Sequence, residues 1–131
     1  MSGAIAGFDH VSLPLRNADA MAAFYRALGL TVDETEHLVV VHLGDQMINF
    51  HREAMWTRDH FTLRAPAATP PCGDFCVVWT GSVDELDAAI AAAGAAVEEG
   101  PVSRRGARGI DATSVYVRDP DGNLVELMRY P

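Results

Sequence analysis

The sequence predicts an α+β fold in which two βαβββ modules form one cup-shaped mixed sheet with the helices outside. An internal repeat predicts the modules: helical runs close at Gly29 and at Gly94, 65 residues further on, and an apolar strand precedes each run. Alternation predicts the cup, because several strands are polar on one face and apolar on the other. The modules span about residues 6–51 and 74–130 of a single domain of 131 residues.

The first module opens with a strand from Phe8 to Leu15, in which polar and apolar residues alternate. Asn17 or Asp19 can cap the helix that follows, and Gly29 suits a left-handed cap at its end. A turn at Gly44-Asp45 joins the last two strands of this module. The three strands after the helix are predicted at residues 30–36, 38–43 and 46–51.

Residues 52–73 carry three prolines and have no clear period, so we predict a loop that links the modules. The second module repeats the order of the first. Its first strand covers residues 74–80, and Ser82 caps its helix with Asp84 and Glu85 in the first turn. The three remaining strands are predicted at residues 95–98, 112–118 and 123–130, with a type I turn at Asp119-Pro120-Asp121-Gly122 between the last two.

The composition excludes several classes of function. The net charge is −8, and an acidic surface repels phosphate backbones, so nucleic acid is not an expected partner. All ten basic residues are arginine, which excludes Schiff-base chemistry and a phosphate loop with its lysine. No apolar run is long enough to span a membrane and no signal-peptide pattern is visible, so we expect a cytoplasmic protein. Cys72 and Cys76 are expected to be reduced thiols.

Five ionisable or amide residues fall on the polar strand faces: His10, Asn49, His51, Asp74 and Glu126. The opposite faces are apolar and are expected to pack on the helices. An unpaired carboxylate among apolar neighbours is costly, so Glu126 indicates a metal or a strong partner. Asp74 begins its strand and could instead be solvated, and His51 ends its strand and could face solvent.

Five segments resemble those of a known family: residues 8–13, 24–30, 48–51, 99–102 and, most strongly, 115–126. On these segments the chain resembles the vicinal oxygen chelate superfamily over nearly its whole length. The superfamily includes glyoxalase I, extradiol ring-cleaving dioxygenases, methylmalonyl-CoA epimerase, and bleomycin and fosfomycin resistance proteins. Within it, the chain is most similar to small glyoxalase-I-like proteins.

The resemblance implies a divalent metal, which could be Zn²⁺, Ni²⁺, Co²⁺, Mn²⁺ or Fe²⁺. Its implied ligands are His10, Asp74 and Glu126. The chain departs from the known ligand sets at two positions, because Asn49 stands where glyoxalase I usually has Glu, and Asp74 where glyoxalase I and the dioxygenases have His. His51 is the alternative source of the missing ligand.

The implied reaction is that of a glyoxalase-I-like lyase or isomerase, in which the metal holds two vicinal oxygens and stabilises an enediolate. Glu126 or His51 would take the substrate proton. Two alternatives stay open: an extradiol dioxygenase with iron held by His10, His51 and Glu126, and a non-enzymatic binding protein. A homodimer is expected from the resemblance, which leaves open whether the cup forms within one chain or across two.

A glycine-rich stretch near residue 105 concentrates three arginines in an acidic protein. We interpret it either as a solvated loop or as a hinged lid that binds an anionic substrate. The residues expected to bind substrate are therefore Asn49, His51, Arg104, Arg105 and Arg108.

Overall fold

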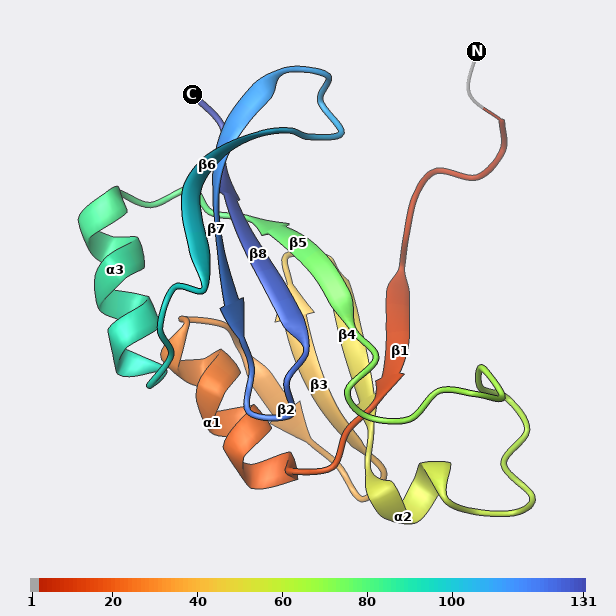
Figure 1. Cartoon of the computed structure of the whole chain (residues 1–131). Helices are drawn as coiled ribbons and strands as arrows, with labels where there is room; N and C mark the ends of the chain where they lie inside the picture. The colour runs from red at the N-terminus through yellow and green to blue at the C-terminus, as the bar shows by residue number, and fades with distance from the viewer. Residues whose placement is uncertain (1–2) are drawn as a thin grey trace.

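The computed structural model describes residues 3–131 and confirms the predicted α+β fold of two βαβββ modules (Figure 1). Each module forms a four-stranded mixed sheet, with strand orders β1-β4-β3-β2 and β5-β8-β7-β6. In each sheet the outer strand that opens the module runs parallel to the strand that closes it, and the other pairs are antiparallel. The strands are β1 (His10–Pro14), β2 (Val32–Glu34), β3 (Leu38–Leu43), β4 (Gln46–His51), β5 (Asp74–Val78), β6 (Glu99–Arg105), β7 (Asp111–Arg118) and β8 (Leu124–Arg129).

The helices are α1 (Ala18–Ala27), α2 (Glu53–Trp56) and α3 (Val83–Ala92). In α3, Ser82 and Glu85 form the reciprocal capping box that the sequence predicts. Asn17 is the N-cap of α1, but its side chain makes no capping bond and instead donates to Asp121, 2.8 Å away. Gly29 adopts the predicted left-handed conformation with φ 97°, and Gly94, which closes the second helical run, has φ 71°.

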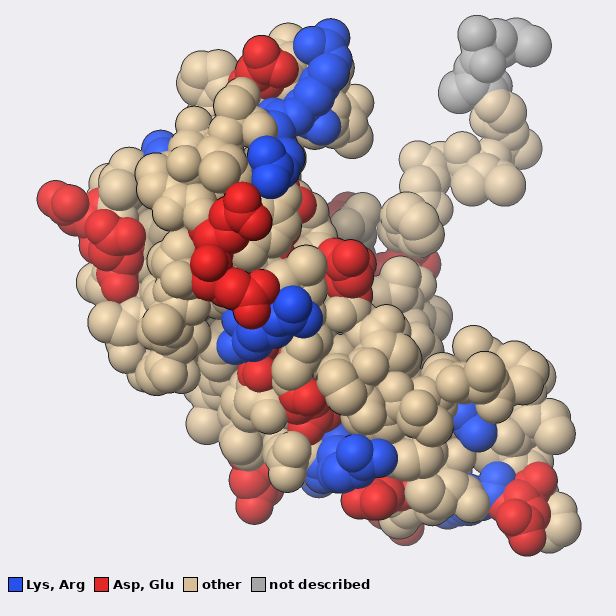
Figure 2. All heavy atoms as spheres, in the orientation of Figure 1, with Lys and Arg blue, Asp and Glu red and all other residues tan. Residues whose placement is uncertain are grey.

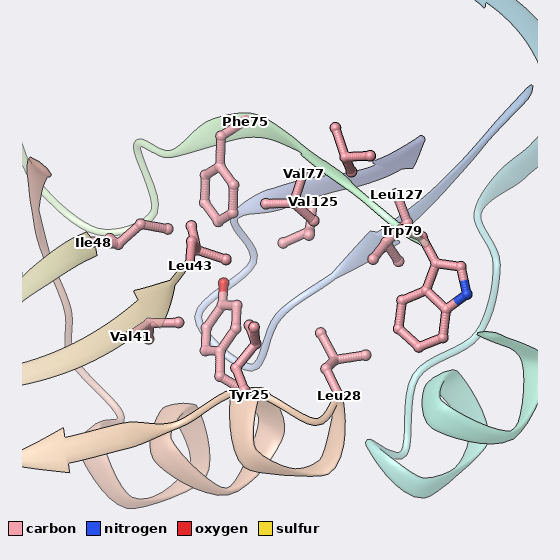
Figure 3. Close-up of a pocket in the computed structure, with 12 residues that line it drawn as sticks. Tyr25, Leu28, Val41, Leu43, Ile48, Phe75, Val77, Trp79, Val125 and Leu127 are labelled. Carbon is pink, nitrogen blue, oxygen red and sulfur yellow. The ribbon is translucent and has the colours of Figure 1, made fainter. Parts of the chain in front are cut away.

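The hydrophobic core lies between the sheets and the long helices, which pack side by side (Figure 1). The apolar strand faces point into this core as expected, except that Val11 stays 39% exposed on an outer strand. A small cavity of about 70 Å³ remains in the core between α1 and the strands (Figure 3). Its lining is apolar apart from the Tyr25 hydroxyl and the Trp79 indole nitrogen, and it lies on the helix side of the sheets.

Hydrogen bonds from α1 to the turn between β7 and β8 join the two modules. The Tyr25 hydroxyl donates to buried Asp119 at 2.7 Å. Asp121 accepts the backbone N–H groups of Arg16 and Asn17 at 2.8 and 2.9 Å. The predicted turn is therefore also the connection that fixes one module against the other.

Two predictions about secondary structure were wrong. The strand expected at residues 95–98 begins later, as β6, and Arg104 and Arg105 therefore lie on a strand and not in a loop. The pairing register shifts between Glu99 and Val102, and Gly100 adopts φ 113°. This irregular start hides the strand, because it breaks the alternation on which strand prediction depends. The linker also contains α2, a helix too short to show a period.

Figure 2 shows arginine side chains near the tip of the β6–β7 hairpin and in further groups in the middle and lower part of this face, with acidic side chains between them. Cys72 and Cys76 are free thiols. Within residues 3–131, no helix has both the length and the apolar composition needed to cross a membrane.

Candidate metal and substrate site

His10 begins β1, and its side chain is 44% exposed on the polar face of the first sheet. Its Nδ1 lies 2.7 Å from a carboxylate oxygen of the preceding Asp9. A carboxylate can only accept, so Nδ1 carries the proton in this contact. The ring is therefore oriented with Nε2 free to bind a ligand, which is the arrangement that carboxylates impose on metal-binding histidines.

Glu126 lies on β8, an inner strand of the second sheet, and is half-buried. The hydroxyl of fully buried Ser114 donates to its Oε2 at 2.6 Å, which leaves Oε1 available. On the outer strand beside it, burial together with the charge and hydrogen bonding of Glu126 raises the pKa of the Cys76 thiol to about 11. Two neutral groups, the Ser114 hydroxyl and the Cys76 thiol, therefore adjoin this carboxylate, and the positive charge of Arg104 also acts on it.

Asp74 begins β5 and is exposed on the same polar face as Glu126. His10 belongs to the other sheet. Within one chain the predicted ligands do not form a cluster: residues 3–131 contain no group of three His, Cys, Asp or Glu side chains placed to hold a metal.

Asn49 and His51 lie two residues apart on the polar face of β4. The Oδ1 atom of Asn49 is buried with no hydrogen-bond partner, which is unusual in a folded protein. His51 is 9% exposed, and its ring packs edge-on against Phe61 with centroids 5.1 Å apart. Burial, and secondarily the positive charge of Arg64, lower the pKa of His51, so the imidazole is neutral near pH 7.

The three candidate arginines have different surroundings. Arg104 lies on the polar face and donates from Nε to the hydroxyl of Tyr116 at 2.9 Å. Tyr116 in turn is the β7 register partner of Glu126. Arg105 points to the opposite face, 3.8 Å from Asp111, and Arg108 stacks on the ring of Tyr130, 4.3 Å from its centroid. Only Arg104 therefore shares a face with Glu126.

Sequence reasoning missed several neighbours of the candidate residues. Ser114 and Tyr116 support Glu126 and Arg104, and their even spacing along the last-but-one strand could have revealed their shared face. Phe61 and Arg64 approach His51 from the linker, and no local pattern in that segment predicts the contact.

Comparisons with known proteins agree with the fold. The sequence profile of the Glyoxalase/Bleomycin resistance protein/Dioxygenase superfamily matches residues 7–127. Proteins of this superfamily are typically metal-dependent, bind small molecules and form dimers.

Two curated relatives align over nearly the whole chain. A virulence protein of Salmonella typhimurium is 34% identical over 124 residues, which cover 93% of this chain and 83% of the relative. A glyoxalase domain-containing protein of Mycosarcoma maydis is 33% identical over 127 residues, which cover 96% of this chain and 69% of that protein.

Solved structures show the same fold. The crystal structure of the Salmonella virulence protein superposes with a TM-score of 0.83 at 32% identity, covering 97% of this chain and 98% of the other. Lactoylglutathione lyase from Agrobacterium tumefaciens superposes with a TM-score of 0.71 at 27% identity, covering 97% and 96% of the two chains.

Proposed function

Because this chain belongs to the Glyoxalase/Bleomycin resistance protein/Dioxygenase superfamily, we propose that it is a glyoxalase-I-like, metal-dependent lyase or isomerase. Its substrate would be a small molecule with two vicinal oxygen atoms. The observation that carries the proposal is that a hydrogen bond from a neighbouring residue orients each of the His10 and Glu126 side chains. Asp9 binds His10 Nδ1 and leaves Nε2 for a ligand, and Ser114 binds Glu126 Oε2, with the Cys76 thiol beside the same carboxylate.

The donor set suits the divalent metals of this chemistry, since an imidazole and carboxylates are ligands for zinc, nickel, cobalt, manganese and iron. His10 and Glu126 would hold the metal, with Asp74 as the favoured further ligand because it shares the polar face with Glu126. A metal bound there would supply Lewis-acid polarisation of the two substrate oxygens.

The protein's own residues would bind the substrate and move its proton. The Glu126 carboxylate, held by Ser114, would accept the proton from the substrate carbon, with His51 as the alternative base because it is neutral near pH 7. Asn49 Oδ1 would accept a hydrogen bond from a substrate hydroxyl, which would satisfy a buried atom that has no partner in the chain. Arg104 would contact an anionic or oxygen-rich end of the substrate.

The site would be completed by a second copy of the chain. His10 and Glu126 belong to different sheets, and β1 and β5 are outer strands whose free edges can face a partner. Exposed apolar side chains lie at or beside these strands: Phe8 is 76%, Val11 39% and Val78 49% exposed. A dimer that covers them would place the polar face of one chain's first sheet opposite that of the partner's second sheet.

Elemental analysis of protein purified without added metal tests the proposal. Wild type should carry close to one divalent metal per chain, and His10→Ala or Glu126→Gln should weaken metal binding by at least about 10–100-fold, the loss that supporting residues alone can cause. His42→Ala is the matched control, because His42 also contacts an acidic residue, Asp33, on a sheet surface. Full metal occupancy in both ligand variants, or a wild type without metal, would contradict the proposed metal site and favour a non-enzymatic binding protein.

Mixing the two ligand variants tests the shared site. A heterodimer of a His10→Ala chain and a Glu126→Gln chain contains one doubly damaged site and one intact site if each site uses both chains. Metal binding should then return to about one ion per heterodimer, whereas sites built within single chains would stay empty. Separate Asp74→Asn and His51→Ala variants identify the further ligand.

His51 supports a second candidate function, because it lies two residues beyond Asn49 on the same face of β4 and burial lowers the pKa of its imidazole. With His10 and Glu126 it would give the two-His, one-carboxylate set of an iron(II) extradiol dioxygenase. Oxygen consumption with a catechol by the iron-loaded protein, lost in His51→Ala, would favour that activity over the isomerase.

A further inference from the structure

A small, partly open cavity lies near the C-terminal ends of β1 and β4, beside α2 and the linker. Its volume is about 80 Å³. Ser12 and His51 line it from the two strands, Trp56 closes one side, and Arg64 with the alanines at 65 and 68 forms the wall on the linker side. The cavity therefore combines groups of β1 with groups from residues 51–68.

The polar groups around this cavity have unused hydrogen-bonding capacity. Arg64 donates from Nη1 to the carbonyls of Ala65 and Ala68, at 3.3 and 2.9 Å, which fixes the guanidinium and leaves its other nitrogens free. Within the described residues, no carboxylate forms an ion pair with Arg64. The rings of His51 and Phe61 pack edge-on, which restrains the imidazole beside the cavity.

Such a cavity suits an anion. A half-buried guanidinium loses hydration, and an anionic oxygen group would restore its interactions through charge-assisted hydrogen bonds. The His51 ring can donate from at least one nitrogen in either protonation state, and the Ser12 hydroxyl can donate as well. The cavity volume is several times the ~10–15 Å³ that one water molecule requires, so a carboxylate or phosphate group fits.

The position of the cavity connects it to the proposed substrate site. Ser12 is the register partner of Asn49 and shares a strand face with His10, two residues earlier. From these observations we infer that the cavity binds the carboxylate or phosphate of a small acidic substrate, with Arg64 as its principal contact. This inference rests on the proposed function and assigns the substrate to the small organic acids or phosphate esters.

Isothermal titration of the full-length, as-purified protein with lactate and with inorganic phosphate tests the inference, with sodium chloride at matched ionic strength as reference. Wild type should bind at least one of the two anions saturably, and the comparison of lactate with phosphate identifies the preferred group. Arg64→Gln should weaken that binding by roughly 10-fold or more, as expected for the loss of a charged hydrogen-bonding partner. Arg129→Gln, which removes an arginine that lines a hollow without Arg64, should leave that binding within about two-fold of wild type.

Two results would overturn the inference: absence of saturable binding of either anion by wild type, or equal binding by wild type and Arg64→Gln. The metal content of the same samples separates this failure from failure of the proposed function. Protein that holds metal but binds neither anion contradicts only the anion site, and protein that binds an anion without any metal contradicts only the metal-dependent reaction. Thermal unfolding of Arg64→Gln near the wild-type temperature would show that the variant is folded.

Discussion

Removal of the Tyr25 hydroxyl should measure the strength of the connection between the two modules. Tyr25 is 1% exposed and donates to Asp119, which is 4% exposed. In Tyr25→Phe the ring stays, so packing is kept and only the hydrogen bond to the carboxylate is lost. A hydrogen bond to a charged group contributes about 1.5–3 kcal/mol.

The surroundings of Asp119 place the expected loss in the lower half of that range. Asp119 accepts five hydrogen bonds, and four remain in the variant: three from the backbone N–H groups of residues 121–123 and one from the Asn123 side chain. The carboxylate therefore does not become an unpaired buried charge. A loss of about 2 kcal/mol would lower the melting temperature by roughly 5–8 °C for a chain of this length.

Thermal unfolding at fixed protein concentration, followed by circular dichroism, measures this loss. Tyr116→Phe is the matched control, because it removes the same atom from a partly exposed tyrosine that accepts one bond from Arg104. Burial, followed by the Asp119 charge, raises the pKa of Tyr25 well above 10.0. The folded state therefore retains a proton that the unfolded state releases, and wild type should lose stability above pH 10 more steeply than Tyr25→Phe. Equal melting temperatures for the two Phe variants would refute the role of this hydrogen bond.

Three further predictions concern single sites. Gly100→Ala should destabilise the protein by about 1–3 kcal/mol in urea unfolding, because Gly100 has φ 113° and an added Cβ would lie 2.5 Å from the carbonyl oxygen of Ser114. Burial lowers the pKa of His51 below 6.5, so the unfolded state binds a proton at a higher pH than the folded state does. Metal-free wild type should therefore lose stability as pH falls below 6.5, by at most about 1.4 kcal/mol per pH unit. The loss should be shallower in His51→Asn. The pKa of the Cys76 thiol is raised to about 11, so this thiol should react slowly with iodoacetamide at pH 8. In a Cys72→Ser background, Glu126→Gln should accelerate the reaction. An unchanged rate would contradict the contact between the thiol and the carboxylate.

The sequence by itself determined the modules and most of their elements. Glycines after two helical runs, a capping box at Ser82 and strict alternation in the apolar strands are local signals, and each is satisfied within a few residues. The same alternation assigned Glu126 and Asn49 to polar faces, because side-chain direction in a strand has a period of two. It failed at β6, where a bulge and a left-handed glycine break the period.

Only the tertiary structure decided which candidate residues share a surface. Arg104 and Arg105 are adjacent in sequence, yet pairing with β7 directs the first toward Tyr116 and the second toward Asp111. The placement of His10 and Glu126 on different sheets follows from strand pairings between distant parts of the chain. The approach of Arg64 to His51 depends on the path of a linker that has no repeating pattern. Such contacts join residues distant along the chain, and local propensity and periodicity carry no information about them.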